Sequence, residues 1–381
     1  MASLRPEKAF QNDIIDYLVS NNCFIARKNK HFNPSLAMDC ELLLKFIKET
    51  QKQAYEALKH SVKGDVDLAL VNGIRSQIVQ KGGSLIESLK KGVSVGNVKF
   101  DLMYRRPATS FNKDLNEKYG KNIFSVMDEV IPSADDKERI DLVLFINGLA
   151  IISVELKYQP QQNMNDAIAQ FRLTRDPKCP LFAFKQGCLV NFAMDQHEVS
   201  MTTKINGEST YFRPFNKGKG EGVFAGAGNP TNPDGYDVSY MWEDIWTKDT
   251  LIDLISNFIF VAKKEIKDEE SGKVKIAEDL IFPRYHQLDA IRKILADVKV
   301  NRSSQNYLIQ HSAGSGKTNT IAWLAHRLSS LHTVDDQIIF NTIIIVTDRI
   351  VVDRQLQNAV RTIEHKSGLI KVMDEQCSSA D

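Results

Sequence analysis

Residues 140–156 are the part of the sequence that most limits how this chain can fold. Two apolar runs, Ile140–Ile146 and Leu149–Leu156, flank the dipeptide Asn147-Gly148. Asn-Gly between two β-type runs is the strongest short-range signal for an antiparallel hairpin, because both residues tolerate the positive φ angles of a tight turn. The chain is therefore expected to contain a sheet with this hairpin buried inside it.

Three ionisable residues lie at one end of this hairpin. Asp141 stands near the start of the first strand, and Glu155 and Lys157 stand two residues apart at the end of the second. Residues two apart on a strand share a face, whereas Val154 and Leu156 point the other way, into the core. Carboxylate oxygens suit Mg²⁺, and a lysine can orient and help deprotonate an attacking water. The pattern predicts metal-assisted phosphodiester hydrolysis, with Asp141 and Glu155 as the metal ligands.

A solvated strand face that carries a Glu/Lys pair is the structural alternative. An ionised group at the end of an apolar strand is tolerated only with partners, which favours the functional interpretation of Glu155. A two-residue turn with regular pairing would place Asp141 opposite Val154, facing away from Glu155. A shared metal requires Asp141 opposite Glu155. We therefore predict an odd-length turn, such as a type I turn with a glycine bulge, or a bulge within the strands.

Apolar periodicity outlines the remaining elements. Helical spacing predicts helices over residues 6–21, 36–60, 164–174 and 242–264, with Trp242 and Trp246 in the core, and shorter runs predict strands over 98–104 and 123–130. Six glycines and two prolines between Asn216 and Gly235 indicate a loop or linker. We expect a first domain over residues 1–215, a Gly/Pro-rich linker and helical connection over 216–280, and a third region over 281–381.

Composition excludes several classes of protein. The 49 Lys and Arg residues nearly balance the 48 Asp and Glu residues, for a net charge of +1, so nucleic acid would be bound through local patches rather than bulk charge. Five cysteines without a CxxC pair predict a reducing compartment and no structural zinc. The N-terminus has no apolar signal segment, and no run is long enough to span a membrane. We expect a cytoplasmic protein.

Residues 307–328 predict a phosphate-binding loop. An apolar run, Tyr307–Gln310, reads as a short buried strand and is followed by His-Ser-Ala-Gly-Ser-Gly-Lys-Thr and a helical run. The glycines allow backbone N–H groups to surround phosphates at a helix N-terminus. His311 departs from the general pattern, which has Gly or Ala there. The expected ATP-binding residues of the loop are Gly314, Ser315, Gly316, Lys317, which would reach the β and γ phosphates, and Thr318, which would ligate the nucleotide Mg²⁺.

Two segments flank this loop. Upstream, Pro283–Gln287 resembles the glutamine motif by which superfamily 2 helicases read adenine, which makes Gln287 a further ATP-binding candidate. Downstream, residues 343–349 read as a strand that ends in Thr347-Asp-Arg349 and resembles a motor segment that contacts the DNA backbone. Asp374-Glu375 lacks the context of an acidic ATPase motif. The third region, residues 281–381, is therefore expected to be the start of a helicase-like motor domain that stops before that motif.

The nuclease motif and the P-loop, in this order along the chain, resemble the arrangement in one enzyme family. Asp141 and Glu155-X-Lys157 match the pattern of PD-(D/E)XK nucleases, with Ile140 in place of proline. A nuclease motif upstream of a superfamily 2 P-loop resembles the restriction (R) subunit of type I restriction–modification enzymes. The segments that carry this likeness are 46–51, 139–148, 154–157 and 347–349.

This resemblance implies an α/β fold, with a restriction-endonuclease-like mixed sheet flanked by helices, then a helical connection and a partial RecA-like domain. It implies Mg²⁺-dependent cleavage of double-stranded DNA, ATP-driven translocation in the full-length subunit, and methyltransferase (M) and specificity (S) subunits as partners. Asp141 and Glu155 would bind Mg²⁺, and Lys157 would complete the site. Gln170 is a further candidate, although Thr174 stands where this branch often has tyrosine.

Two other functions fit the same residues. One is a helicase–nuclease of DNA repair or recombination, and the other is a non-catalytic DNA-binding assembly module in which the carboxylates are structural. Arg105 and Arg106 are candidate DNA contacts, because short basic runs favour phosphate, and Arg349 is a candidate through the resemblance of residues 343–349 to a DNA-contacting motor segment.

Overall fold

The computed structural model describes residues 6–107, 109, 111–133, 138–220, 225–267, 274–302, 304–333, 335–348 and 350–363. The chain divides into two compact units. The first comprises Met1–Ile259 with Asp279–Tyr285, and the second comprises Phe260–Glu278 with His286–Asp381.

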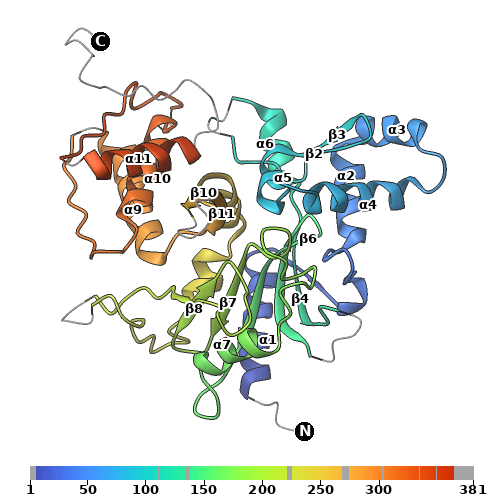
Figure 1. The fold of residues 1–381 in the computed structure, drawn as a ribbon, viewed down its shortest axis with the longest axis horizontal. Helices are drawn as coiled ribbons and strands as arrows, with labels where there is room; N and C mark the ends of the chain where they lie inside the picture. The colour runs from blue at the N-terminus through green and yellow to red at the C-terminus, as the bar shows by residue number, and fades with distance from the viewer. Residues whose placement is uncertain are drawn as a thin grey trace. The chain divides into compact units, whose positions relative to one another are not determined.

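A seven-stranded mixed sheet, in the order β1-β4-β5-β6-β7-β8-β9, forms the centre of the first unit (Figure 1). β1 with β4 and β6 with β7 run parallel, and the other neighbours run antiparallel. The strands are Ile25–Arg27 (β1), Phe124–Val130 (β4), Ile140–Ile146 (β5), Leu149–Leu156 (β6), Val190–Met194 (β7), Val199–Thr202 (β8) and Arg213–Pro214 (β9). The predicted α/β class with a mixed sheet is confirmed.

The first unit also contains helices, only some of which lie against this sheet (Figure 1). They are α1 (Pro6–Ser20), the short turn η1 (Asn29–His31), α2 (Cys40–Thr50), α3 (Lys52–Ser61), α4 (Val66–Val79), α5 (Leu85–Lys91), α6 (Lys113–Gly120) and α7 (Met164–Leu173). The helical region expected over roughly 36–60 begins at Cys40 and consists of two helices that meet at Gln51. Asp39 caps the first of them by accepting a hydrogen bond from the Leu42 N–H.

A small separate hairpin corrects one strand prediction. β2 (Val93–Val95) pairs with β3 (Val98–Phe100) in an antiparallel two-stranded sheet. The strand expected over 98–104 therefore ends at Phe100, because its partner offers only three residues for pairing.

Both faces of the central sheet are covered by apolar side chains. On one face, Ala167 and Phe171 of α7 pack in a cluster with Val143 and Phe145 of β5. On the other face, Phe192 of β7 contacts the rings of Phe215 and Trp246. Because both of its faces are covered, β6 is buried along its whole length. Its mostly apolar sequence without polar alternation is typical of such a strand.

The described parts of the Gly/Pro-rich segment after Phe215, residues 216–220 and 225–235, form loops and turns within the first unit. The Asn229 side-chain amide donates to the His197 carbonyl at 2.8 Å, and its carbonyl accepts from the Lys217 N–H at 2.8 Å. Helical turns follow: η2 (Met241–Ile245), α8 (Lys248–Asp253) and η3 (Leu254–Phe258). Trp242 and Trp246 are buried in the core, as predicted.

The helix expected over 242–264 is wrong beyond Phe258. Residues Phe260–Lys267 form β10, which pairs with β11 (Val274–Ile281) in a two-stranded sheet. Three helices follow: α9 (Tyr285–Asn301), α10 (Lys317–Ser329) and α11 (Ile350–Ile363). The helical run predicted after the candidate phosphate-binding loop is confirmed as α10.

The two strands predicted beside that loop are not formed. Residues 307–310 and 343–347 have no regular structure, and the side chains of Leu308 and Val346 are 92% and 87% exposed. Neither segment has a neighbouring strand within the residues that the structure describes. A strand without neighbours leaves its backbone N–H and C=O groups unpaired, so β propensity alone does not produce one.

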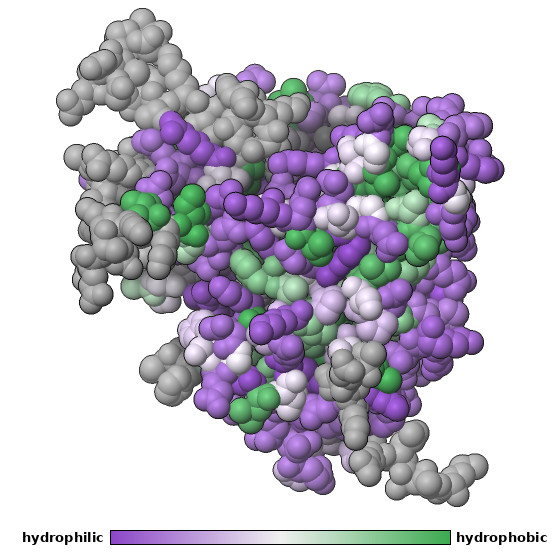
Figure 2. Space-filling view, turned by 45° about the vertical axis from the view of Figure 1, so that its right-hand side comes forward, coloured by the Kyte–Doolittle hydropathy of each residue, from purple (hydrophilic) through white to green (hydrophobic). Residues whose placement is uncertain are grey.

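No described helix combines the length and the apolar composition that crossing a membrane requires. On the face shown in Figure 2, hydrophobic residues form small separate patches between hydrophilic ones.

The β5–β6 turn is fixed by its own residues. Asn147 and Gly148 have φ angles of 49° and 80°, as a type I′ turn requires. The Asn147 side chain is buried, accepts from the Ile123 N–H at 2.7 Å and donates to the Leu102 carbonyl at 2.9 Å. A Cβ on Gly148 would lie 2.3 Å from the Asp39 carbonyl oxygen. The turn is therefore packed tightly against the start of α2.

Gly148→Ala is expected to lower the free energy of unfolding by at least about 2 kcal/mol, because it adds backbone strain and a clash with fixed backbone atoms. Gly96→Ala is the matched control, since Gly96 has a φ of 59° and a Cβ added there would meet no atom within 4 Å. It should cost about 1 kcal/mol, the strain of the left-handed conformation alone. Urea unfolding followed by circular dichroism measures both, and equal losses would contradict the close approach.

Candidate active site

A bulge in β6 brings Asp141 and Glu155 to the same face of the sheet. Near the turn, Ile146 pairs with Leu149 and Phe145 with Ala150, but beyond it Leu144 pairs with Ile152 and Leu142 with Val154. The later register, continued by one residue, sets Asp141 opposite Glu155. The turn itself has two residues, so the predicted shift is confirmed in its second form, a bulge within the strands.

Asp141 is held in place by the neighbouring backbone. Its Oδ2 accepts a hydrogen bond from the Leu156 N–H at 2.6 Å, and its own carbonyl accepts from the Gln11 side chain of α1. Burial raises the pKa of Asp141 from 3.8 to about 6, although the Leu156 hydrogen bond and the charge of Lys157 oppose the rise. A metal cation would reverse this shift by stabilising the ionised carboxylate.

Glu155 is completely buried and has one oxygen with a partner and one without. Arg175 contacts Oε1 through Nε at 2.8 Å and through Nη2 at 2.6 Å. Oε2 is buried and has no hydrogen-bond partner. Burial and the proximity of Asp141 raise the pKa of Glu155 well above its ordinary value, against the effect of Arg175 and Lys157.

Lys157 follows the last residue of β6 and lies beside a carboxylate from α1. Its N–H donates to the Met194 carbonyl at 2.9 Å, which extends the pairing with β7 by one residue. Its Nζ is 3.9 Å from Oε2 of Glu7, and its side chain is 9% exposed. The Lys157 side chain is therefore nearly buried, and backbone pairing fixes its main chain at the end of the sheet that carries Asp141 and Glu155.

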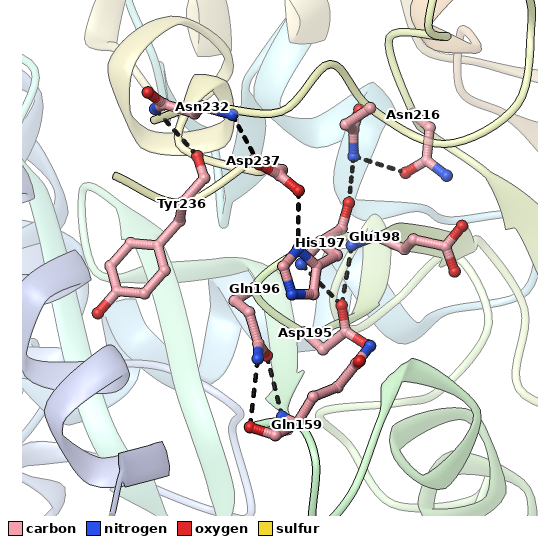
Figure 3. Close-up of polar contacts among 10 residues, drawn as sticks. Gln159, Asp195, Gln196, His197, Glu198, Asn216, Asn232, Tyr236 and Asp237 are labelled. Carbon is pink, nitrogen blue, oxygen red and sulfur yellow. Dashed lines mark hydrogen bonds and ion pairs between the residues drawn. The ribbon is translucent and has the colours of Figure 1, made fainter. Parts of the chain in front are cut away.

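A polar network anchors the segment after Lys157 (Figure 3). The Gln159 side chain donates to Asp195 Oδ2 at 2.8 Å, and the Gln159 N–H donates to Gln196 Oε1 at 3.0 Å. The other Asp195 oxygen accepts from the backbone N–H groups of His197 and Glu198, and His197 is 2.7 Å from Asp237. These bonds tie the loop after β6 to the loop after β7.

The donor set fits Mg²⁺. Asp141 and Glu155 offer hard carboxylate oxygens on adjacent strands, and the buried Glu155 Oε2 lacks any other partner. No group of three or more His, Cys, Asp or Glu side chains placed to hold a metal occurs in the part of the chain that the structure describes. Two carboxylates are nevertheless a usual protein contribution to Mg²⁺, which keeps several waters and binds substrate phosphates.

Arg175 is the residue of this site that sequence reasoning missed. It lies two residues after the end of α7 and carries no motif signal, because an isolated arginine after a helix is usually exposed. Gln170 lies half-buried on α7, and its backbone carbonyl accepts from the Thr174 hydroxyl at 2.8 Å. Its role at the site stays a prediction.

The candidate phosphate-binding loop of the second unit contains two glycines with positive φ angles. Gly314 and Gly316 have φ angles of 72° and 87°, and α10 begins at Lys317, directly after Gly316. The Lys317 Nζ donates to the carbonyls of His311 and Ser312 at 3.1 and 2.9 Å. The ammonium group therefore lies over the loop, where phosphate oxygens would compete for its hydrogen bonds.

Gln287 is buried against this loop. Its side-chain amide donates to the Gly316 carbonyl at 2.9 Å and to the Thr320 hydroxyl at 3.2 Å. A Cβ at Gly316 would lie 2.7 Å from the Gln287 amide nitrogen, which gives a packing reason for glycine there. Ser315 is buried and Thr318 half-buried at the start of α10. Their role in ATP binding stays a prediction.

Two of the three candidate DNA-contact arginines have other partners in this structure. Arg105 donates to the Lys90 carbonyl at 2.7 Å, and Arg106 forms an ion pair with Asp249 at 3.0 Å. Arg349 lies outside the described residues.

The raised pKa of Asp141 predicts a pH dependence of stability in metal-free protein. The native state holds its proton up to about pH 6, whereas the unfolded state loses it near 3.8. The contribution of this group to the free energy of unfolding is therefore fully present below pH 4. It falls by about 3 kcal/mol as the pH rises from 4 to 6. Asp141→Asn should remove this part of the loss, measured by urea unfolding with EDTA at several pH values. An unchanged slope would contradict the burial of an ionisable Asp141.

Comparison with known proteins finds two matching families and two similar proteins. Residues 25–210 match the type I restriction enzyme R protein N terminus, and residues 280–380 match the type III restriction enzyme res subunit. Two similar proteins of Methanocaldococcus jannaschii are the putative type I restriction enzyme MjaVIIIP and MjaVIIP endonuclease subunits, 26% and 27% identical over 260 residues. The matches cover 64% and 65% of this chain and 22% of each relative, so the chain spans about a fifth of their length. By these comparisons the chain is similar to type I restriction enzyme R proteins.

Proposed function

We propose that this chain contains a Mg²⁺-dependent endonuclease that cleaves the phosphodiester bonds of double-stranded DNA. One observation carries the proposal: the bulge in β6 sets Asp141 opposite Glu155, and Glu155 keeps a buried oxygen without a partner. A regular hairpin would have separated the two carboxylates. The family of the matched residues 25–210 supports the same activity.

The chemistry follows from the three side chains. Asp141 and Glu155 would hold Mg²⁺, which when bound neutralises the charge that builds on the scissile phosphate. Lys157, whose side chain is nearly buried beside Glu7, would orient the attacking water and help deprotonate it. The backbone bonds at Leu156 and Lys157 keep these groups from rearranging.

In the longer protein, we propose that this nuclease is coupled to ATP-driven DNA translocation. The glycine geometry of residues 314–316 and the position of Lys317 over the loop support ATP binding. Methyltransferase and specificity subunits would be its partners and would supply the DNA recognition sequence. A helicase–nuclease of DNA repair would share both motifs, whereas the family match of residues 25–210 favours restriction.

Plasmid cleavage tests the nuclease. The 381-residue chain should nick or linearise supercoiled plasmid with Mg²⁺ and not with EDTA. Lys157→Ala should lower the cleavage rate at least ~100-fold, the usual effect of losing a group that assists proton transfer. Lys178→Ala is the matched control, because Lys178 is exposed and carries the same charge; its rate should equal that of the wild type.

Equal rates for wild type and Lys157→Ala would reject the catalytic assignment. The buried Arg175–Glu155 ion pair is the observation that favours the alternative, a DNA-binding assembly module with structural carboxylates. That alternative predicts DNA binding without Mg²⁺-dependent cleavage in both proteins.

Nucleotide binding tests the second unit separately. Lys317→Ala should weaken the binding of a fluorescent ATP analogue at least ~10-fold, because the ammonium group no longer neutralises the phosphates. Lys293→Ala is the control, since Lys293 pairs with Asp289 on α9 and is exposed. Equal affinity in wild type and Lys317→Ala would exclude the loop as the ATP site.

A further inference from the structure

Arg175 connects the two strands that carry the candidate metal ligands. Its Nε and Nη2 both contact Glu155 of β6, and Nη2 also donates to the backbone carbonyl of Arg139 at 2.8 Å. Arg139 precedes the first residue of β5 and lies two residues before Asp141. The guanidinium group therefore sits at the point where β5 begins and β6 ends.

The guanidinium group of Arg175 is buried and has several polar contacts. The side chains of Arg175 and Glu155 are both 0% exposed, and Nη1 lies 3.4 Å from Oε2 of Glu138. Nε and Nη2 of Arg175 are thus held by Glu155 and by the Arg139 carbonyl, whereas Nη1 has the ion-pair contact with Glu138 but no hydrogen bond. A side chain held in this way has little freedom to move, so it can set the rotamer of Glu155.

The pairing between the two residues is unsymmetrical. Arginine and carboxylate usually form a fork, with two parallel bonds to two oxygens. Here Nε and Nη2 converge on Oε1, at 2.8 and 2.6 Å, and Oε2 keeps no partner although it is buried. A purely structural ion pair is expected to satisfy both oxygens, because an unpartnered buried carboxylate oxygen is costly.

We propose that Arg175 is a positioning residue for the metal site: it holds Oε1 of Glu155 so that Oε2 remains directed to the cation shared with Asp141. This inference rests on the proposed function, because it assigns Glu155 as a metal ligand. Arg175 acts through Glu155 and does not take the place of the cation, since it leaves Oε2 free. Partners behind metal-binding carboxylates commonly set metal affinity in this way.

Binding of Mn²⁺, used as a spectroscopic probe for Mg²⁺, tests the inference without catalysis. Electron paramagnetic resonance titration of the 381-residue chain measures free Mn²⁺ and hence affinity. Arg175→Met should weaken binding by about 10- to 100-fold, the usual effect of losing such a partner. Arg175→Lys keeps the charge but loses the paired donors, so it should bind between the wild type and Arg175→Met.

Three controls separate positioning from general effects. Arg172→Met removes the same charge from α7, but Arg172 contacts only the Thr210 carbonyl among the bonds described, so its Mn²⁺ affinity should match the wild type. Phe171→Leu destabilises the packing of the same helix without touching Glu155, and it should also bind normally. Asp141→Asn should lose binding, which confirms that the titrated ion occupies this site.

The outcomes separate the positioning role from the metal site itself. Wild-type protein that binds no Mn²⁺ at this site would overturn the proposed metal-dependent function, and this inference with it. Wild-type binding together with unchanged affinity in Arg175→Met and Arg175→Lys would overturn the inference alone. If Arg175→Met does not fold, Arg175→Lys decides: wild-type affinity in that variant overturns the positioning role, and weaker binding supports it.

Discussion

One unpaired residue in β6 determines which side chains of the hairpin share a face. Ile151 has no partner on β5, because Phe145 pairs with Ala150 and Leu144 with Ile152. Since strand side chains alternate, a shift of one residue changes the face of everything beyond it. Asp141 meets Glu155 only because of this bulge, and the candidate metal site depends on it.

The same arrangement concentrates charge in a buried place. Two carboxylates with raised pKa values lie among apolar strands, and the cationic groups beside them are Arg175 and Lys157. Burial works against ionised carboxylates, while a cation works for them. A bound divalent metal would add to the positive charge of Arg175 and Lys157 and so stabilise the ionised form of both carboxylates. The nearly neutral net charge of the chain is consistent with this local concentration of charge.

In the second unit, elements that need only local hydrogen bonds form as predicted, whereas two predicted strands do not form. The glycine loop and α10 form as their residues predict, since a turn and a helix satisfy their hydrogen bonds locally. The apolar segments on either side stay exposed, because a strand needs a neighbour. The helix predicted to continue past Phe258 fails for a related reason: Phe260–Lys267 finds a partner strand in Val274–Ile281.

The sequence by itself determined the β5–β6 hairpin, the glycine loop, most helices and the identity of Asp141, Glu155 and Lys157 as the candidate site. These depend on local periodicity, turn chemistry and residue type. Only the tertiary structure decided that the register shift lies inside β6 and that Arg175 reaches Glu155 from beyond α7. Both depend on contacts between residues distant in sequence, and no local pattern encodes such contacts.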